Sequence, residues 1–360
     1  GDIAVPNRFA MAPMTRCQCP TGVADERVAS YYEKRAEGGV GLIITEGTSI
    51  NHEAAPGYPD VPVICGADAV AGWKSVTDKV HQAGSKILSQ LWHVGSCRKP
   101  GFDPEGKIPM VAPSAVVHPV FSPQDVHLTP KELTKAEIDH LIGCYASSAR
   151  GAAEAGFDGV EVHAAHGYLL DQFFWDRTNK RTDEYGGNWE NKTRLATQVV
   201  SAIKQSTPRR FVLGFRFSQW KLGAFDEVLF HSPQELEEFL DPLVTAGVNL
   251  FHVSTYRFDA PAFAGSNMSL AGWTKKLSGK PVIAVGGVGV STKFSEEKLG
   301  HETAGALNFD RVEKAMSKGE FDLIAIARAL IADPQLPRKI LRGDWDEIVP
   351  YSKDMLGRYE

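Results

Sequence analysis

Short apolar runs alternate with segments of helical periodicity along almost the whole chain of 360 residues. The apolar runs are brief and nearly unbroken, as is typical of parallel strands covered by helices. They span residues 8–13, 41–45, 86–91, 159–163, 211–217, 249–254, 281–286 and 321–327. The helical segments include 28–37, 71–83, 135–155, 189–205, 233–246 and 309–318. Eight strands alternating with helices predict an α/β fold of the (β/α)8, or TIM barrel, type, with a doubly wound sheet as the alternative.

Boundary signals support these helices. Thr134 and Glu137 have the spacing of a capping box, and Gly84, Gly156 and Gly247 follow helical segments as C-terminal glycines do. No interior stretch has the composition of a linker, so we expect a single domain over residues 1–360. Segments 96–129, 218–232 and 291–308 are predicted to be loop excursions at the C-terminal face of the barrel.

Composition limits the partners and the compartment. The formal net charge of −5 offers no general attraction to nucleic acid or to an anionic membrane, and no apolar run approaches the ~18 residues of a membrane helix. Five cysteines, an odd number, indicate free thiols in a reducing compartment. No signal peptide is recognisable at the start, although the chain begins with Gly1. We expect a cytoplasmic monomer or homodimer with no nucleic-acid or membrane partner.

Unusual polar residues and glycines lie at the C-terminal ends of the predicted strands, where the chemistry of such barrels is found. They are Thr15, Arg16, Glu46, Gly47, Gln90, Trp92, His93, His163, His166, Tyr168, Arg216, Gly286, Gly287 and Arg328. Arg216 lies within an apolar strand, where a guanidinium is costly unless an anion meets it. Gly286, Gly287 and Arg328 follow the last two strands and favour a phosphate site, with a carboxylate partner for Arg328 as the alternative.

His163 and His166 are three residues apart, so on a helical turn both rings would face the same way. Three interpretations are open: a pair of metal ligands, two structural histidines, or two donors to one carbonyl oxygen. Tyr168 would add a phenol that can donate a proton. The cysteine spacings match no ligand set, so we predict no metal and no iron–sulfur cluster.

Together these residues form a signature that resembles the Old Yellow Enzyme family over essentially the whole chain. The matching stretches are NRFAMAPMTR at 7–16, GLIITEGT at 41–48, SQLWHVG at 89–95, GFDGVEVHAAHGYLLDQF at 156–173, NKRTDEYGGNWENKTRL at 179–195, GFRFS at 214–218 and ARALIADP at 327–334. The HxxHGYLLxQF and RTDEYGG strings are the most specific. We interpret Arg181, Asp183 and Tyr185 of the second string as structural rather than catalytic.

The resemblance implies bound FMN as cofactor and NADPH or NADH as reductant. The implied FMN contacts are Pro13, Met14 and Thr15 at the isoalloxazine, Gly47, Gln90 and Arg216 at its pyrimidine ring, and Gly286, Gly287 and Arg328 at the phosphate. With threonine at position 15, the sequence resembles the branch of the family that includes oxophytodienoate reductases and nitroester reductases. Ala327 stands where many relatives have glycine.

The implied activity is ping-pong reduction of the C=C bond of α,β-unsaturated ketones or aldehydes. Hydride would pass from flavin N5 to Cβ, and Tyr168 would protonate Cα. His163 and His166 would hold the carbonyl oxygen, and Trp92 would line the substrate pocket. Nitro compounds or nitrate esters are a further expected substrate class. The alternatives are a flavin-free barrel aldolase or isomerase with a phosphorylated substrate, and a non-catalytic flavin-binding module.

Overall fold

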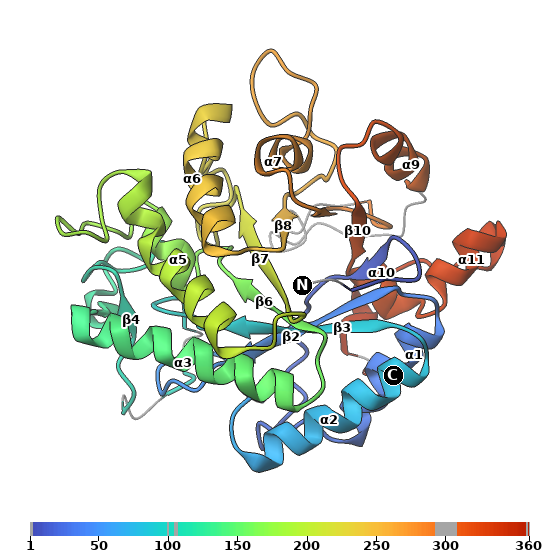
Figure 1. Cartoon of the computed structure of the whole chain (residues 1–360), viewed down its shortest axis with the longest axis horizontal. Coiled ribbons are helices and arrows are strands. Elements are labelled where there is room, and N and C mark those ends of the chain that lie inside the picture. Colours follow the sequence, from blue (N-terminus) through green and yellow to red (C-terminus); the bar gives the residue numbers. More distant parts are fainter. Residues whose placement is uncertain (1–2, 99–100, 104–106, 292–307, 358, 360) are drawn as a thin grey trace.

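The computed structural model describes residues 3–98, 101–103, 107–291, 308–357 and 359, and its centre is a closed barrel of parallel strands (Figure 1). The strands pair in the order β1-β10-β9-β8-β7-β6-β3-β2. Their bounds are β1 Phe9–Met11, β2 Leu42–Ser49, β3 Lys86–Trp92, β6 Gly159–His163, β7 Val212–Ser218, β8 Leu250–Ser254, β9 Val282–Val285 and β10 Leu323–Ile326. The (β/α)8 prediction is therefore confirmed, because a doubly wound sheet would remain open.

Helices surround the barrel, and each lies between consecutive strands of the barrel or follows the last one (Figure 1). The long helices are α1 Glu26–Glu37, α2 Ala67–Gln82, α3 Lys135–Glu154, α5 Trp189–Ser206, α6 Pro233–Ala246, α7 Leu270–Ser278 and α9 Phe309–Ser317. The short ones are α4 Leu169–Phe174, α10 Arg328–Ala332 and α11 Leu336–Arg342. The six predicted helical segments are confirmed to within a few residues, whereas α4, α7, α10 and α11 were not among them. In the described residues, no helix has the length and apolar character needed to cross a membrane.

The helix ends follow from local chemistry. Glu137 N–H donates to Thr134 Oγ1, and Thr134 N–H donates to the Glu137 carboxylate, so the predicted capping box is present at the start of α3. Gly84, Gly156 and Gly247 follow α2, α3 and α6 with φ of +87°, +87° and +114°. These left-handed conformations suit glycine and end each helix before the next strand.

Side chains on the strands alternate between the interior of the barrel and the side covered by helices. The interior cluster consists of Ala10, Ala12, Leu42, Ile44, Leu88, Val212, Leu250, Ile283, Val285 and Ala325. Further along the same inward faces the residues become polar: Gln90 follows Leu88 by two positions, and His252 follows Leu250 by two. The interior therefore has an apolar layer, which fills the barrel, beneath a polar layer toward the C-terminal ends.

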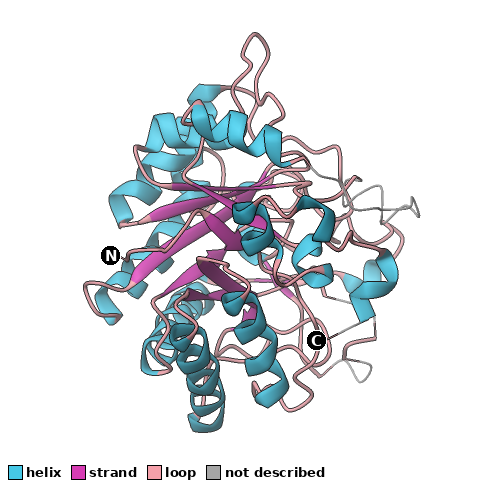
Figure 2. Cartoon of the chain, turned by 90° about the vertical axis from the view of Figure 1, so that its right-hand side faces the viewer, coloured by secondary structure: helices cyan, strands magenta, loops and turns pink. Residues whose placement is uncertain are grey.

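Loop excursions extend from the strand ends (Figure 2). Within segment 96–129, His118 Nε2 lies 2.9 Å from the carbonyl oxygen of Gly167, so this segment reaches the loop after β6. Strand β4 (Val111–Ala112) of the same segment pairs with β5 (Lys131–Glu132) in a separate small sheet. The predicted excursion at 291–308 lies outside the described residues except at its two ends.

The RTDEYGG segment is held by a partly buried ion pair. Arg181 donates from Nε and Nη2 to the two carboxylate oxygens of Asp183 over 2.9 and 2.6 Å, and from Nη1 to the carbonyl oxygens of Pro113 and Leu133. Asp183 also accepts from the backbone N–H of Tyr185. These contacts join the loop before α5 to the excursion after β3, as expected for a structural role.

We predict that Asp183→Ala lowers the free energy of unfolding by about 2 kcal/mol, because it removes both charge-assisted hydrogen bonds of the nearly buried Arg181 guanidinium and leaves it the more exposed Glu132, at 3.5 Å, as carboxylate partner. Glu184→Ala is the matched control, since Glu184 forms an exposed pair with Lys135 at 2.7 Å and its loss should cost less than about 1 kcal/mol. Urea unfolding followed by tryptophan fluorescence measures both. Equal effects of the two substitutions would contradict a structural role for Asp183.

Candidate active site

A bulge in β2 shapes one side of the barrel mouth. The register with β3 shifts between Ile44 and Gly47, so β2 continues to Ser49 rather than ending at residue 45 as the sequence suggested. Thr45 Oγ1 accepts the backbone N–H of Gln90 over 3.0 Å and so satisfies a donor that the bulge removes from the ladder. A Cβ on Gly47 would lie 2.5 Å from the Trp92 ring, so only glycine fits there.

His163 and His166 meet at the mouth, but not on a helical turn. His163 ends β6, and His166 lies in the following loop with φ of +64°. The left-handed residue folds the loop back, so that the two ring centroids are 5.4 Å apart and nearly perpendicular. The predicted convergence is thus present, while the helical reason given for it was wrong.

Both imidazoles are expected to be neutral. Burial, followed by the charge of Arg216, holds the pKa of His163 and of His166 well below the usual range. The backbone N–H of Ala165 donates to His163 Nδ1 over 3.3 Å, which places the ring proton on Nε2. His166 Nε2 lies 2.8 Å from the hydroxyl of Ser254. His163 therefore retains an N–H that it can donate to a ligand.

Tyr168 completes this group just before α4. Its ring centroid is 5.1 Å from that of His163 and 5.0 Å from that of Trp92. Its hydroxyl is 3.3 Å from that of Tyr58, a residue that the sequence analysis did not identify. Burial, followed by Tyr58, raises the pKa of Tyr168 well above its ordinary value, so the phenol keeps its proton.

A second aromatic wall was also missed. The Trp220 ring stacks on His166 with centroids 4.2 Å apart, and Tyr256 stacks on Trp220 with centroids 5.1 Å apart. Trp220 comes from the loop after β7 and Tyr256 from the loop after β8. Nothing in their local sequence sets them apart from core aromatics, and only the closed barrel brings them to His166.

Arg216 lies in a buried polar layer with Gln90, Glu161 and His252, on neighbouring strands. Gln90 Nε2 donates to Glu161 over 2.8 Å, and His252 Nδ1 lies 2.7 Å from the other oxygen of that carboxylate. Within the described part of the chain, Arg216 Nε has no hydrogen-bond partner. Glu161 and His252 were missed, although the argument applied to Arg216, a polar residue within an apolar strand, would have identified them.

Gly286, Gly287 and Arg328 directly follow two adjacent strands, β9 and β10, at the same end of the barrel. Gly286 and Gly287 follow β9 with φ of +151° and +69°, and a Cβ on Gly286 would lie 2.2 Å from the carbonyl oxygen of Thr255. The Asn308 side chain stabilises this turn: its Nδ2 donates to the carbonyl oxygen of Gly287 over 2.8 Å, and its Oδ1 accepts from the Gly289 N–H over 2.9 Å. Arg328 follows β10, whose Ala325 pairs with Val285 of β9. The turn and the guanidinium therefore share one end of the barrel.

Pro13, Met14 and Thr15 follow β1 and are partly or fully exposed at the mouth. Glu46 anchors their loop, since its Oε2 accepts the backbone N–H of Arg16 over 2.9 Å. Burial raises the pKa of Glu46 to about 7. Glu46, the acid among the strand-end residues of the sequence analysis, therefore supports the loop that contains Thr15.

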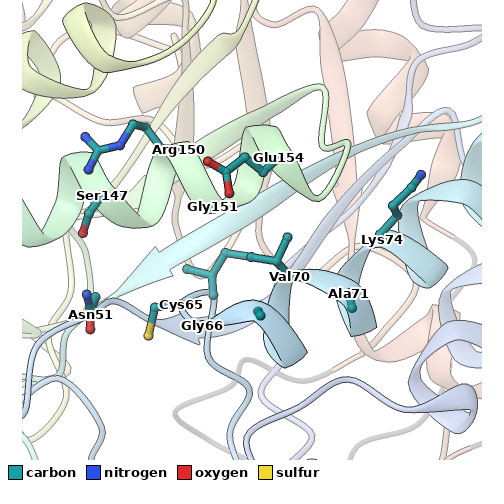
Figure 3. A pocket seen from close by; sticks show the side chains of 12 residues that line it. Asn51, Cys65, Gly66, Val70, Ala71, Lys74, Ser147, Arg150, Gly151 and Glu154 are labelled. Atoms are coloured by element: carbon teal, nitrogen blue, oxygen red, sulfur yellow. The ribbon is translucent and has the colours of Figure 1, made fainter.

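A cavity of about 720 Å³ lies elsewhere, between α2 and α3 on the outside of the barrel (Figure 3). Its polar lining side chains, among them Lys74, Arg150 and Glu154, are exposed to solvent and make no convergent group. A second, of about 1060 Å³, is lined by Arg8, Phe9 and residues of α9 and α11. Neither contains the histidines, so the side chains at the mouth mark the candidate active site. Among the described residues, no three His, Cys, Asp or Glu side chains are placed to hold a metal ion.

The mouth residues fit a flavin mononucleotide. Arg216 Nε is buried without a partner among the described residues, and the pyrimidine edge of a flavin, where charge accumulates on reduction, would supply one. Gly47 lets the Trp92 ring pack directly against the backbone of β2 at the mouth, and Arg328 lies at the same end as the Gly286–Gly287 turn. These features provide cationic and backbone donors at both ends of a long anionic ligand.

Comparisons with known proteins agree. The model of the NADH:flavin oxidoreductase / NADH oxidase family matches residues 1–347. Putative 12-oxophytodienoate reductase 2 of Oryza sativa subsp. japonica is 33% identical over 341 residues, 94% of this chain and 84% of that protein. NADH oxidase of Thermoanaerobacter brockii is 32% identical over 357 residues, 97% of this chain and 50% of that protein.

Solved structures extend the likeness to the fold. Morphinone reductase in complex with tetrahydroNAD has 29% identity and a TM-score of 0.77, with 100% of this chain and 95% of that chain covered. An Old Yellow Enzyme from a Pichia species has 27% identity and a TM-score of 0.79, with 98% and 87% covered. As the sequence motifs predicted, this chain belongs to the NADH:flavin oxidoreductase / NADH oxidase family, the flavoprotein oxidoreductases to which Old Yellow Enzyme is related, and the family implies an FMN cofactor.

Proposed function

We propose that this chain is an ene reductase that uses NADPH or NADH to reduce the C=C bond of α,β-unsaturated ketones and aldehydes in a ping-pong cycle. The observation that carries the proposal is the convergence of His163, His166 and Tyr168. The ring centroids of His166 and Tyr168 lie 5.4 and 5.1 Å from that of His163. An enone needs donors at its oxygen and an acid at its α-carbon, and two imidazoles beside a phenol supply both.

The names of relatives support this substrate class. One relative is a 12-oxophytodienoate reductase, and one solved neighbour is a morphinone reductase in complex with tetrahydroNAD. Both names indicate reduction of an oxo compound, and the complex supports access of a nicotinamide to the mouth. The His163–His166 pair also suits the oxygens of nitro compounds and nitrate esters, which we propose as further substrates.

FMN, when bound, supplies the redox chemistry by taking hydride from the nicotinamide and giving it to the β-carbon of the substrate. The side chains of the protein orient the substrate and polarise its C=C bond. His163 donates Nε2–H to the substrate oxygen, and His166, whose Nε2 contacts the Ser254 hydroxyl, donates its Nδ1–H to the same oxygen, which withdraws charge from the C=C bond. Tyr168 holds its proton because of its raised pKa and delivers it to the α-carbon, while Trp92 walls the pocket.

We propose that FMN is held by the residues that the family resemblance implies. Pro13, Met14 and Thr15 would lie along the isoalloxazine, Gly47, Gln90 and Arg216 at its pyrimidine ring, and Gly286, Gly287 and Arg328 at the phosphate. The unpartnered Arg216 Nε and the shared end of Arg328 and the glycine turn support this assignment.

The direct test is an anaerobic cycle on the purified yellow protein. NADPH, or NADH in parallel, should bleach the flavin absorbance, and cyclohexenone should then restore it. Bleaching without reoxidation by any of several enones would leave a flavoprotein that is not an ene reductase. A protein without flavin absorbance would favour the flavin-free aldolase or isomerase alternative.

We predict that Tyr168→Phe slows reoxidation by cyclohexenone about 100-fold or more, because it removes the proton donor, and leaves reduction by NADPH nearly unchanged. Stopped-flow measurement of the two half-reactions separates these effects. Tyr145→Phe is the control, since the Tyr145 hydroxyl is buried outside the barrel, on α3. Equal slowing of both half-reactions in Tyr168→Phe would remove Tyr168 from the donor role.

We predict that combined His163→Ala and His166→Ala substitutions weaken phenol binding at least about tenfold, because each removes a hydrogen bond to a charged oxygen. Titration with a phenol, followed by the long-wavelength charge-transfer absorbance, measures the dissociation constant. His231→Ala, at an exposed position, provides the control. An unchanged titration curve in the double variant would show that the imidazoles do not bind the ligand oxygen.

A further inference from the structure

Glu161 is a carboxylate at the middle of β6, inside the barrel and without exposed surface. One oxygen accepts from Gln90 Nε2 over 2.8 Å, and the other lies 2.7 Å from His252 Nδ1. A charged group in this position is costly unless it is paired. Here the partners come from β3, next to β6, and from β8, on the far side of β7. None of the roles assigned so far uses this carboxylate.

The hydrogen bonds determine the protonation of the group. Burial alone would raise the pKa of Glu161, but the hydrogen bonds from His252 and Gln90 and the charge of Arg216 bring it below its ordinary value. Burial lowers the pKa of His252, against the opposing effect of Glu161. We therefore describe a charged Glu161 that accepts from the Nδ1–H of a neutral His252, whose buried Nε2 has no partner among the described residues.

This assignment also fixes the side-chain amide of Gln90. An ionised carboxylate only accepts hydrogen bonds, so the amide nitrogen must face Glu161. The amide oxygen is then left for a donor at the mouth, such as the ring N–H of a flavin pyrimidine. A protonated or amide residue at position 161 would allow Gln90 to turn either way.

The charge of Glu161 opposes that of Arg216 without a close ion pair. Among the described residues, no carboxylate lies within 4.0 Å of the Arg216 guanidinium, yet Glu161 stabilises its charged form through the low-dielectric interior. Arg216 on β7 pairs in register with His163 on β6, and His163 is two residues after Glu161 on that strand. Arg216 and Glu161 thus contribute one positive and one negative charge to the buried layer beside the expected pyrimidine ring.

We propose that Glu161 is a positioning residue that directs the Gln90 amide toward the flavin and lowers the reduction potential of the bound flavin. Negative charge accumulates at the pyrimidine edge on reduction, so Arg216 favours the reduced form and Glu161 disfavours it. A lower potential makes hydride transfer to a substrate more favourable. This inference rests on the proposed FMN position at the mouth, but not on the identity of the oxidising substrate.

The test is the midpoint potential of flavin in Glu161→Gln holoprotein, measured by dye equilibration without any enone. We expect reduced flavin to gain about tenfold in affinity relative to oxidised flavin, a positive shift of about 30 mV for a two-electron couple. Reoxidation by cyclohexenone should slow, while reduction by NADPH should not. A Glu161→Asp variant, which retains the charge, should shift less.

Asp158→Asn is the matched control, because Asp158 immediately precedes the same strand and pairs with His81 and Lys86 at the opposite end of the barrel. Its potential should equal that of the wild type. If Glu161→Gln does not yield holoprotein, His252→Lys offsets the same carboxylate charge and should also shift the potential positively. An unchanged potential in the tested variant would overturn the inference even where wild-type enone reduction proceeds normally.

Discussion

The buried guanidinium of Arg216 imposes the strongest constraint on this structure. A permanent cation within a strand cannot be solvated, and its Nε has no partner in the described residues. The barrel offsets its charge through Glu161 rather than by a direct ion pair, and so leaves hydrogen-bond donors for a ligand. This combination of a balanced charge and an unused donor is what an anionic cofactor edge requires. It is also what a purely structural arginine would avoid.

The alternation of the strands makes this polar layer possible. The inward residues nearest the N-terminal ends, such as Leu88 and Leu250, fill the barrel and exclude water, while those two positions further on, Gln90 and His252, are polar and buried. Above them, His163 and Trp92 end their strands, while His166 and Tyr168 lie in the loop after β6. The proposed site thus combines a rigid layer of strand residues with groups carried by loops, which vary more readily.

The architecture, and the placing of several candidate site residues at one end of it, could be predicted because both depend on local patterns. Apolar runs at regular intervals predicted the barrel, and the convergence of strand ends brought His163 and Tyr168 together as expected. The helical turn proposed for His166 was wrong, because the spacing alone does not show a left-handed residue. Tyr58 and Trp220 were missed because they reach the site from other loops, and only closure of the barrel makes them neighbours. The roles of the catalytic, substrate-binding and FMN-contacting residues remain predictions.

A crystal structure of the protein as purified tests the central claim most directly. The account predicts FMN across the C-terminal mouth of the barrel, with its pyrimidine ring within hydrogen-bond distance of Gln90 and Arg216 and its phosphate on Arg328. Gln90 should still donate to Glu161 in that structure. A mouth without flavin, in which Arg216 or Arg328 is instead neutralised by a protein carboxylate in direct contact, would contradict it.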